Sequence, residues 1–138
     1  MPGPDFLDTN VLVYAYDSLS PGKQRVARDL VHQAILGESV ISTQVLAEFA
    51  TILLHKISPP PKPEAIAAAL DALDPIKAIV PDGDMVRRAV EVHAKYGLHF
   101  YDGMIVAAAE RAGCPRILSE DLDAGQKYFG VTVVNPFR

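Results

Sequence analysis

Short apolar segments alternate with longer amphipathic segments along almost the whole chain. Five of the apolar segments are continuous and bounded by turn residues, which predicts buried strands at residues 4–8, 39–42, 77–81, 115–121 and 131–137. The segments between them predict helices at residues 10–17, 20–37, 43–57, 64–73, 84–97 and 102–112, with a further short helix between the fourth and fifth strands. This alternation predicts an α/β fold with helices on both faces of a mainly parallel, five-stranded sheet.

Residues that commonly begin or end helices stand at several of these boundaries. Ser42 or Thr43 is expected to cap the helix that follows the second strand, and Gly97 suits a helix end. The sequence SPPPKP at residues 58–63 predicts a connection between two helices, because proline lacks a backbone donor. No internal repeat or domain boundary is visible, so we expect a single domain over residues 1–138.

Polar residues stand where two of the predicted strands end. Asp8 follows the first strand and lies between two apolar segments, where an unpaired buried carboxylate would be costly. Ser119, Glu120 and Asp121 end the fourth strand. Ligands of parallel α/β sheets collect beyond the carboxyl ends of the strands, so we expect these residues to share one edge of the sheet.

Each acidic side chain of interest has a structural explanation beside a functional one. Asp8 either caps the helix that follows it or meets a partner from elsewhere in the chain. Glu48 lies close to the apolar stripe of its helix, where it either reaches solvent at the stripe's edge or faces a partner. Asp102 begins a helix, where the helix dipole favours an aspartate, but the residues around it are apolar and indicate a central helix.

Three acids lie close together after the fourth strand: Glu120, Asp121 and Asp123. We expect Glu120 and Asp123 to be surface acids and Asp121 to face the sheet edge. Asp8, Glu48, Asp102 and Asp121 then form a set of acids at element ends or on apolar faces. Acids crowded in this way repel one another unless a cation neutralises them. Mg²⁺ and Mn²⁺ prefer such oxygen ligands, and the resulting site suits phosphodiester hydrolysis.

Composition excludes several other classes of protein. The chain has 138 residues, a formal net charge of −4 and a single cysteine, which argues against a basic nucleic-acid coat and excludes an internal disulfide. It has no signal-peptide pattern and no apolar stretch long enough for a transmembrane helix, so we expect a cytoplasmic protein without membrane contact. The motifs GxxxxGK[ST], GxGxxG, GxSxG and HExxH are all absent.

The segments FLDTNVLVYAYD, STQVLAEF, FYDGMIVAAAERAGCPRILSEDLDAGQ and VTVVNPF resemble the PIN-domain ribonucleases, especially the VapC-type toxins of prokaryotic toxin–antitoxin systems. The resemblance covers nearly the whole chain. It implies a three-layer α/β/α fold around the parallel sheet and a metal-dependent endoribonuclease with Mg²⁺ or Mn²⁺. It also implies the following site residues: Asp8, Glu48, Asp102 and Asp121 as metal ligands and catalytic acids, with Asn10 and Ser119 in support.

The resemblance further implies an RNA substrate, a cognate antitoxin and a homodimer. The apolar segment EAIAAALDAL offers a surface for the dimer. Two alternatives stay open. One is a catalytically inactive PIN-like domain that binds RNA or a protein. The other is a phosphatase of the haloacid dehalogenase kind, which has an Asp-x-Asp motif where this chain has Asp8-Thr9-Asn10.

Overall fold

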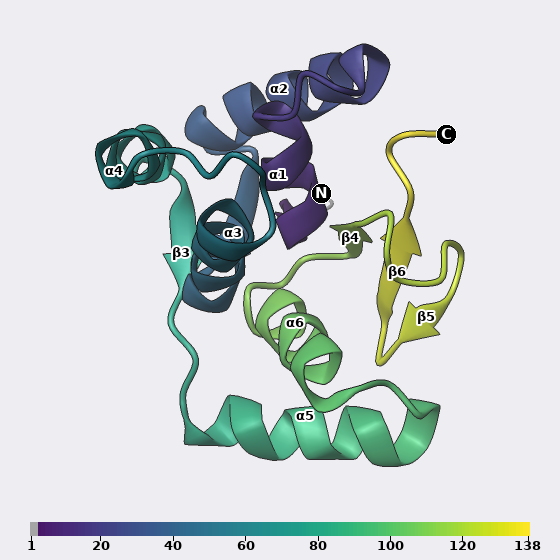
Figure 1. The fold of residues 1–138 in the computed structure, drawn as a ribbon. Coiled ribbons are helices and arrows are strands. Elements are labelled where there is room, and N and C mark those ends of the chain that lie inside the picture. The colour runs from purple at the N-terminus through teal and green to yellow at the C-terminus, as the bar shows by residue number, and fades with distance from the viewer. Residues whose placement is uncertain (1–2) are drawn as a thin grey trace.

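The computed structural model describes residues 3–138 as helices packed around one twisted sheet (Figure 1). The strands lie in the order β3-β2-β1-β4-β6-β5, and all neighbouring pairs are parallel except β5 with β6. The strands are β1 (Asp5–Leu7), β2 (Ser39–Ser42), β3 (Lys77–Ile79), β4 (Arg116–Leu118), β5 (Lys127–Tyr128) and β6 (Val131–Val134). The helices are α1 (Thr9–Ala15), α2 (Pro21–Ile35), α3 (Thr43–His55), α4 (Pro63–Leu73), α5 (Gly83–Tyr96) and α6 (Phe100–Arg111).

The predicted α/β class and mainly parallel sheet are confirmed, but the described sheet has six strands rather than five. The extra strand is β5, which pairs antiparallel with β6 through two residues. The short helix expected between the fourth and fifth strands is wrong. Gly125 there has φ +86°, and its N–H donates to the Val133 carbonyl at 2.8 Å, so the segment turns back toward β6 instead of coiling.

Two layers of helices enclose the sheet, as Figure 1 shows. Helices α1 and α2 lie on one side of the sheet, and α5 and α6 lie on the other. Helix α3 packs against α1, and α4 packs against α3. All residues of α6 from Gly103 to Ala109 are buried, which confirms the expected central helix. Large core side chains come from both layers and from the sheet: Phe6, Leu7, Leu12, Ile41, Phe49, Met85 and Ile105. No helix within residues 3–138 has the length and apolar character needed to cross a bilayer.

The strand order explains why Asp8 and Ser119 meet although 111 residues separate them. The chain runs from β1 outward through β2 to β3, and then returns to the other side of β1 as β4. Strands β1 and β4 are in parallel register, Phe6 with Ile117 and Leu7 with Leu118. Their carboxyl ends therefore lie side by side at the point where the strand order reverses, which is the usual ligand position in such sheets.

Close packing of α6 against α5 positions the start of α6, and Gly103 makes it possible. A Cβ added at Gly103 would lie 2.8 Å from the backbone carbonyl oxygen of Ala89, which is closer than real Cβ contacts. Replacing Gly103 with alanine is expected to lower the free energy of unfolding by about 1–3 kcal/mol, because two backbones must separate. Urea denaturation measures this difference.

Gly22 provides the matched control for this substitution. It lies in α2, and a Cβ added there meets no atom within 4 Å. Gly22→Ala is expected to be neutral or to raise the free energy of unfolding by up to about 1 kcal/mol, because alanine has the higher helix propensity. Equal stability of the Gly103→Ala and Gly22→Ala proteins would contradict this view of the α5–α6 contact.

Candidate active site

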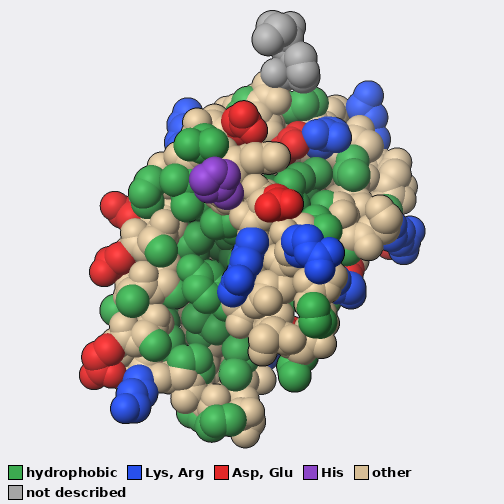
Figure 2. Space-filling model, turned by 90° about the horizontal axis from the view of Figure 1, so that it is seen from above, with side chains coloured by type: hydrophobic (Ala, Val, Ile, Leu, Met, Phe, Trp, Pro, Cys, Tyr) green, Lys and Arg blue, Asp and Glu red, His purple; other side chains and the backbone are tan. Residues whose placement is uncertain are grey.

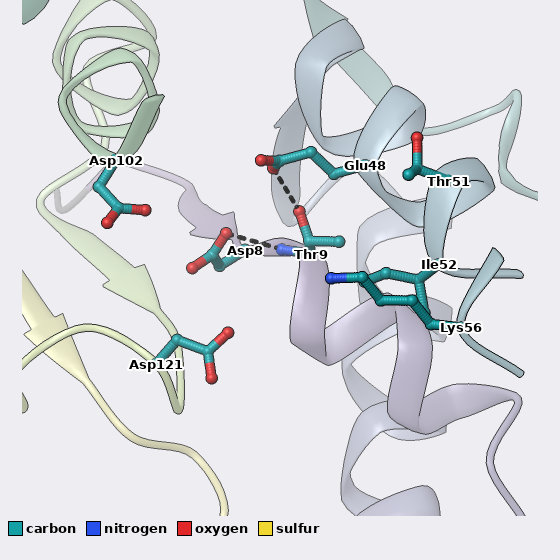
Figure 3. A pocket seen from close by; sticks show the side chains of 8 residues that line it. All are labelled: Asp8, Thr9, Glu48, Thr51, Ile52, Lys56, Asp102 and Asp121. Carbon is teal, nitrogen blue, oxygen red and sulfur yellow. Dashed lines mark hydrogen bonds between the residues drawn. The ribbon is translucent and has the colours of Figure 1, made fainter. Parts of the chain in front are cut away.

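The acids predicted from the sequence line one cavity at the carboxyl edge of the sheet. The cavity has a volume of about 300 Å³ and is lined by Asp8, Thr9, Glu48, Thr51, Ile52, Lys56, Asp102 and Asp121. In Figure 3 the side chains of Asp8, Asp102 and Asp121 face the same space, and Glu48 approaches it from α3. Asp8 comes from the end of β1, Asp102 from the first turn of α6, and Asp121 from the loop after β4.

Asp8 is buried and held on both of its carboxylate oxygens. Its Oδ1 accepts a hydrogen bond from the Thr9 N–H at 2.8 Å, so Asp8 does cap α1. Its Oδ2 accepts a hydrogen bond from the Ser119 hydroxyl, also at 2.8 Å. The capping and functional explanations are therefore compatible, because the cap uses only Oδ1 and Asp8 also lines the cavity.

The surroundings of Asp8 disfavour its charge when no cation is present. Burial raises the pKa of Asp8 from 3.8 to about 6, and the charges of Glu48 and Asp121 act in the same direction. The hydrogen bonds from Ser119 and from the Thr9 N–H oppose this rise. A raised carboxyl pKa at the centre of an acid cluster indicates a site that gains stability from a bound positive charge.

Asp102 and Glu48 enter the cavity from opposite helices. Burial also raises the pKa of Asp102, the charge of His99 lowers it, and the charge of Asp121 raises it. Glu48 is half-buried, and its Oε1 accepts a hydrogen bond from the Thr9 hydroxyl at 2.8 Å. Of the two readings left open for Glu48, the structure therefore supports the one in which it faces a partner.

Asn10 and Ser119 connect Asp8 to Asp121. The side-chain amide of Asn10 donates to the Ser119 hydroxyl at 3.2 Å and to Asp121 Oδ2 at 3.3 Å. Ser119 is completely buried, and its hydroxyl oxygen accepts the Asp121 N–H at 3.1 Å. These two residues link two of the acids through hydrogen bonds, and their supporting role in the site stays a prediction.

The other two acids of the loop after β4 lie outside the cavity. Glu120 is bound to Lys23 at 2.6 Å and accepts a hydrogen bond from the Tyr14 hydroxyl. Asp123 is exposed and does not line the acidic cavity. Among the three neighbouring acids, Asp121 alone lines the cavity with the acids of the other elements.

Sequence reasoning missed Thr9, Thr51, Ile52 and Lys56 as cavity residues. A periodic signal for part of this set exists in the sequence. Glu48, Ile52 and Lys56 are spaced by four residues, so they lie on one face of α3 and its C-terminal cap. Any inference that Glu48 faces the site therefore extends to Lys56, although a lysine at a helix C-terminus is also favoured by the helix dipole alone.

The donor set of the cavity fits a divalent cation in chemistry. Four carboxylates surround the space, and hard oxygen ligands are what Mg²⁺ and Mn²⁺ prefer. Within residues 3–138, no three carboxylate, histidine or cysteine side chains lie close enough together to form a preassembled metal site. Side-chain rotations would have to bring the carboxylates onto a common centre. The assignment of Asp8, Glu48, Asp102 and Asp121 as ligands therefore remains a prediction.

Two solved structures share the fold of this chain at low sequence identity. One belongs to a toxin–antitoxin complex from Klebsiella pneumoniae, with a TM-score of 0.70, 20% identity, and coverage of 96% of this chain and 97% of that chain. The other belongs to VapBC2 from Rickettsia felis bound to a DNA fragment from its promoter, with a TM-score of 0.61, 19% identity, and coverage of 94% and 96%. No curated protein matches the sequence.

The family model for the PIN domain matches residues 6–130. The matched region begins within β1 and ends beyond β5, so it contains Asp8, Glu48, Asp102 and Asp121. Because this match covers most of the chain and agrees with the sheet topology, the protein belongs to the PIN-domain family.

Proposed function

We propose that this protein is a metal-dependent endoribonuclease that acts as the toxin of a VapBC-type toxin–antitoxin pair. PIN domains are generally nucleases that use divalent metal ions. The observation that carries the proposal is the cavity that Asp8, Glu48, Asp102 and Asp121 line together, because four carboxylates from separate elements around one space are what a divalent cation would need. The phosphatase alternative loses its support with the PIN-family match.

The residues of the cavity take distinct roles in the proposed reaction. Asp8, Asp102 and Asp121 would hold Mg²⁺ or Mn²⁺, with Glu48 directly or through water. When bound, such an ion lowers the pKa of a water and stabilises charge on the phosphate and leaving oxygens. Thr9 orients Glu48 by donating to its Oε1. Ser119 and Asn10 hold the carboxylates of Asp8 and Asp121 in position through hydrogen bonds, as outer partners of metal ligands do.

A metal-titrated cleavage assay tests this proposal. The protein, freed of bound metal with a chelator, is mixed with a labelled RNA of mixed sequence, and Mn²⁺ or Mg²⁺ is added back. We expect internal cleavage that rises with metal concentration and stops in excess chelator. Binding of RNA without cleavage at any metal concentration would favour the inactive, binding-only alternative instead.

An antitoxin partner is supported by the solved structures that share the fold, since one is described as a toxin–antitoxin complex and the other as VapBC2 bound to promoter DNA. The proposed antitoxin would be encoded next to this protein, and inspection of the neighbouring reading frames tests its presence. Co-expression of both proteins should allow growth that expression of this protein alone prevents.

We also propose a homodimer that uses α4. Helix α4 buries Ile66, Ala69 and Leu73 but leaves four alanines exposed. A mostly apolar pocket of about 480 Å³ lies along α4 and α3 and contains Tyr16, Leu53, Ile57, Pro61, Ala65, Ile66, Ala68, Ala69 and Ala72. Seen from above, the molecule has a hollow in which hydrophobic side chains gather (Figure 2). A second copy related by a two-fold axis would cover this surface.

Sedimentation equilibrium provides the test of the dimer. The protein without antitoxin is expected to dimerise at micromolar concentration, and Ala68→Arg should weaken dimerisation tenfold or more, because an unpaired charge at the interface must lose its water. Gln33→Arg serves as the control, because it adds the same charge at an exposed position of α2, which contributes no residue to this pocket. A monomer at all concentrations would contradict the dimer.

A further inference from the structure

Lys56 is the one basic side chain among the eight residues that line the acidic cavity. It caps the C-terminus of α3, where its backbone N–H donates to the Ile52 carbonyl at 2.9 Å. Figure 3 shows its side chain extending from α3 toward the cavity, which it lines together with Thr9. The backbone of Lys56 is thus fixed by the helix, while its ammonium group reaches the space between α3 and the end of β1.

The ammonium group of Lys56 is not neutralised by the acids around it. Within residues 3–138, ion pairs are formed by Lys23 with Glu120 and by four arginines, but Lys56 forms none. Among the described residues, its Nζ also donates no hydrogen bond to the carbonyls at the end of α3. A lysine present only to complement the helix dipole has no need to extend into the cavity. Its three donors remain available to a ligand that carries acceptor oxygens.

The charges around the cavity determine how a phosphodiester ligand could bind there. Four carboxylates repel a phosphodiester, and a divalent cation offsets only part of their charge. In Figure 3, Asp102 and Asp121 lie on the side of the cavity away from α3, whereas Lys56 lies on the α3 side. A nucleic-acid strand that crosses the cavity would therefore pass between the acids that hold the metal and a free ammonium group. Lysine serves as a point-charge contact for phosphate in many sites.

We propose that Lys56 binds a backbone phosphate of the RNA strand beside the scissile bond, an inference that rests on the proposed ribonuclease function. Its contact is made in the ground state and in the transition state alike, so it contributes to substrate affinity more than to the chemical step. Lys56→Gln is expected to raise KM for RNA about tenfold and to change kcat by less than about threefold. The slope of log K against log salt should become shallower by about 0.7, the contribution of one phosphate contact with a single strand. Lys56→Arg should retain most of the affinity.

The experiment compares Lys56→Gln with Lys62→Gln in two separate measurements. Lys62 is an exposed lysine that precedes α4, and its side chain makes no capping hydrogen bond, so its replacement matches the change in charge away from the cavity. The first measurement is cleavage at saturating Mn²⁺, with KM and kcat determined separately. The second is binding of a fluorescent single-stranded RNA in Ca²⁺ over a series of salt concentrations. Melting temperatures within about 2 °C of the wild type establish that both variants are folded.

The outcomes distinguish failure of this inference from failure of the proposed function. A rise in KM and a shallower salt slope for Lys56→Gln, with Lys62→Gln unchanged, support the inference. It is overturned if Lys56→Gln behaves like Lys62→Gln in both measurements, or if kcat falls while KM stays unchanged. If the wild type does not cleave RNA, the proposed function fails. The binding measurement then decides the role of Lys56 on its own, since unchanged affinity and salt slope in Lys56→Gln would overturn it.

Discussion

Replacing Asp102 with asparagine is expected to reduce RNA cleavage by about a thousandfold or more and to leave the protein folded. Asparagine preserves the shape of the side chain and its hydrogen-bonding oxygen but removes the negative charge. The proposed metal would then lose one anionic ligand in a cavity where activation of water and stabilisation of developing charge both depend on it. Within residues 3–138, the Asp102 side chain forms no hydrogen bond or ion pair that the substitution would remove, and it lies in the first turn of α6, ahead of the buried residues Gly103–Ala109.

Single-turnover cleavage at saturating Mn²⁺ measures this effect, with Asp123→Asn as the matched control. Asp123 lies two residues beyond Asp121 but does not line the acidic cavity, so its replacement should leave the rate within about twofold of the wild type. If Asp102 only favoured the helix terminus, asparagine would serve nearly as well. Cleavage by Asp102→Asn at the wild-type rate would remove Asp102 from the proposed metal site.

Replacing Asp8 with asparagine is expected to stabilise the metal-free protein at pH 7. The Asp8 carboxyl has a pKa of about 6 in the folded protein, against 3.8 for an unperturbed aspartate. Between these pH values the folded state binds more protons than the unfolded state, so this group's contribution to stability falls as pH rises from about 4 to about 6. Above pH 6 the cost of the buried charge is on the order of 2–3 kcal/mol, because each pKa unit corresponds to about 1.4 kcal/mol.

Free energies of unfolding of both proteins, measured across this pH range, test the prediction. We expect Asp8→Asn to exceed the wild type in free energy of unfolding at pH 7 in chelator, and the difference to shrink as the pH falls from about 6 and to vanish below about 4, where Asp8 becomes protonated in both states. Asparagine can still accept the Thr9 N–H, so the cap of α1 is retained. Its cleavage activity should be lost nonetheless. A variant that is less stable than the wild type at pH 7 would show that hydrogen bonding outweighs the cost of the charge.

The sequence predicts the fold well where a single strand or helix carries a clear pattern. Continuous apolar segments identify five of the strands, and the position of Asp8 and Ser119 at the ends of neighbouring strands follows from the parallel topology. Strand β5 is not predictable in this way. It has two residues, Lys127 and Tyr128, and exists because the turn at Gly125 returns the chain along β6. Such a strand depends on tertiary pairing and leaves no periodicity in the sequence.

For the candidate site too, the sequence identifies single residues but not how the fold brings them together. The local pattern indicates that Glu48 and Asp102 are unusual acids beside apolar residues, but it does not bring them together. Their approach to Asp8 depends on helix packing, which for α6 requires the close contact of Gly103 with the Ala89 carbonyl. Lys56 was overlooked because a lysine at a helix end is already explained by the dipole. Its significance comes only from the cavity that its side chain enters.

Anomalous diffraction from crystals soaked in Mn²⁺ tests most directly the claim that these acids form a metal centre. We expect an anomalous peak in the cavity, with carboxylate oxygens of Asp8 and of Asp102 or Asp121 roughly 2.2 Å from the metal. The peak should be absent from crystals of the Asp102→Asn protein soaked in the same way. A manganese ion bound elsewhere, or a cavity free of metal in a wild-type protein whose RNA cleavage requires Mn²⁺, would contradict the account.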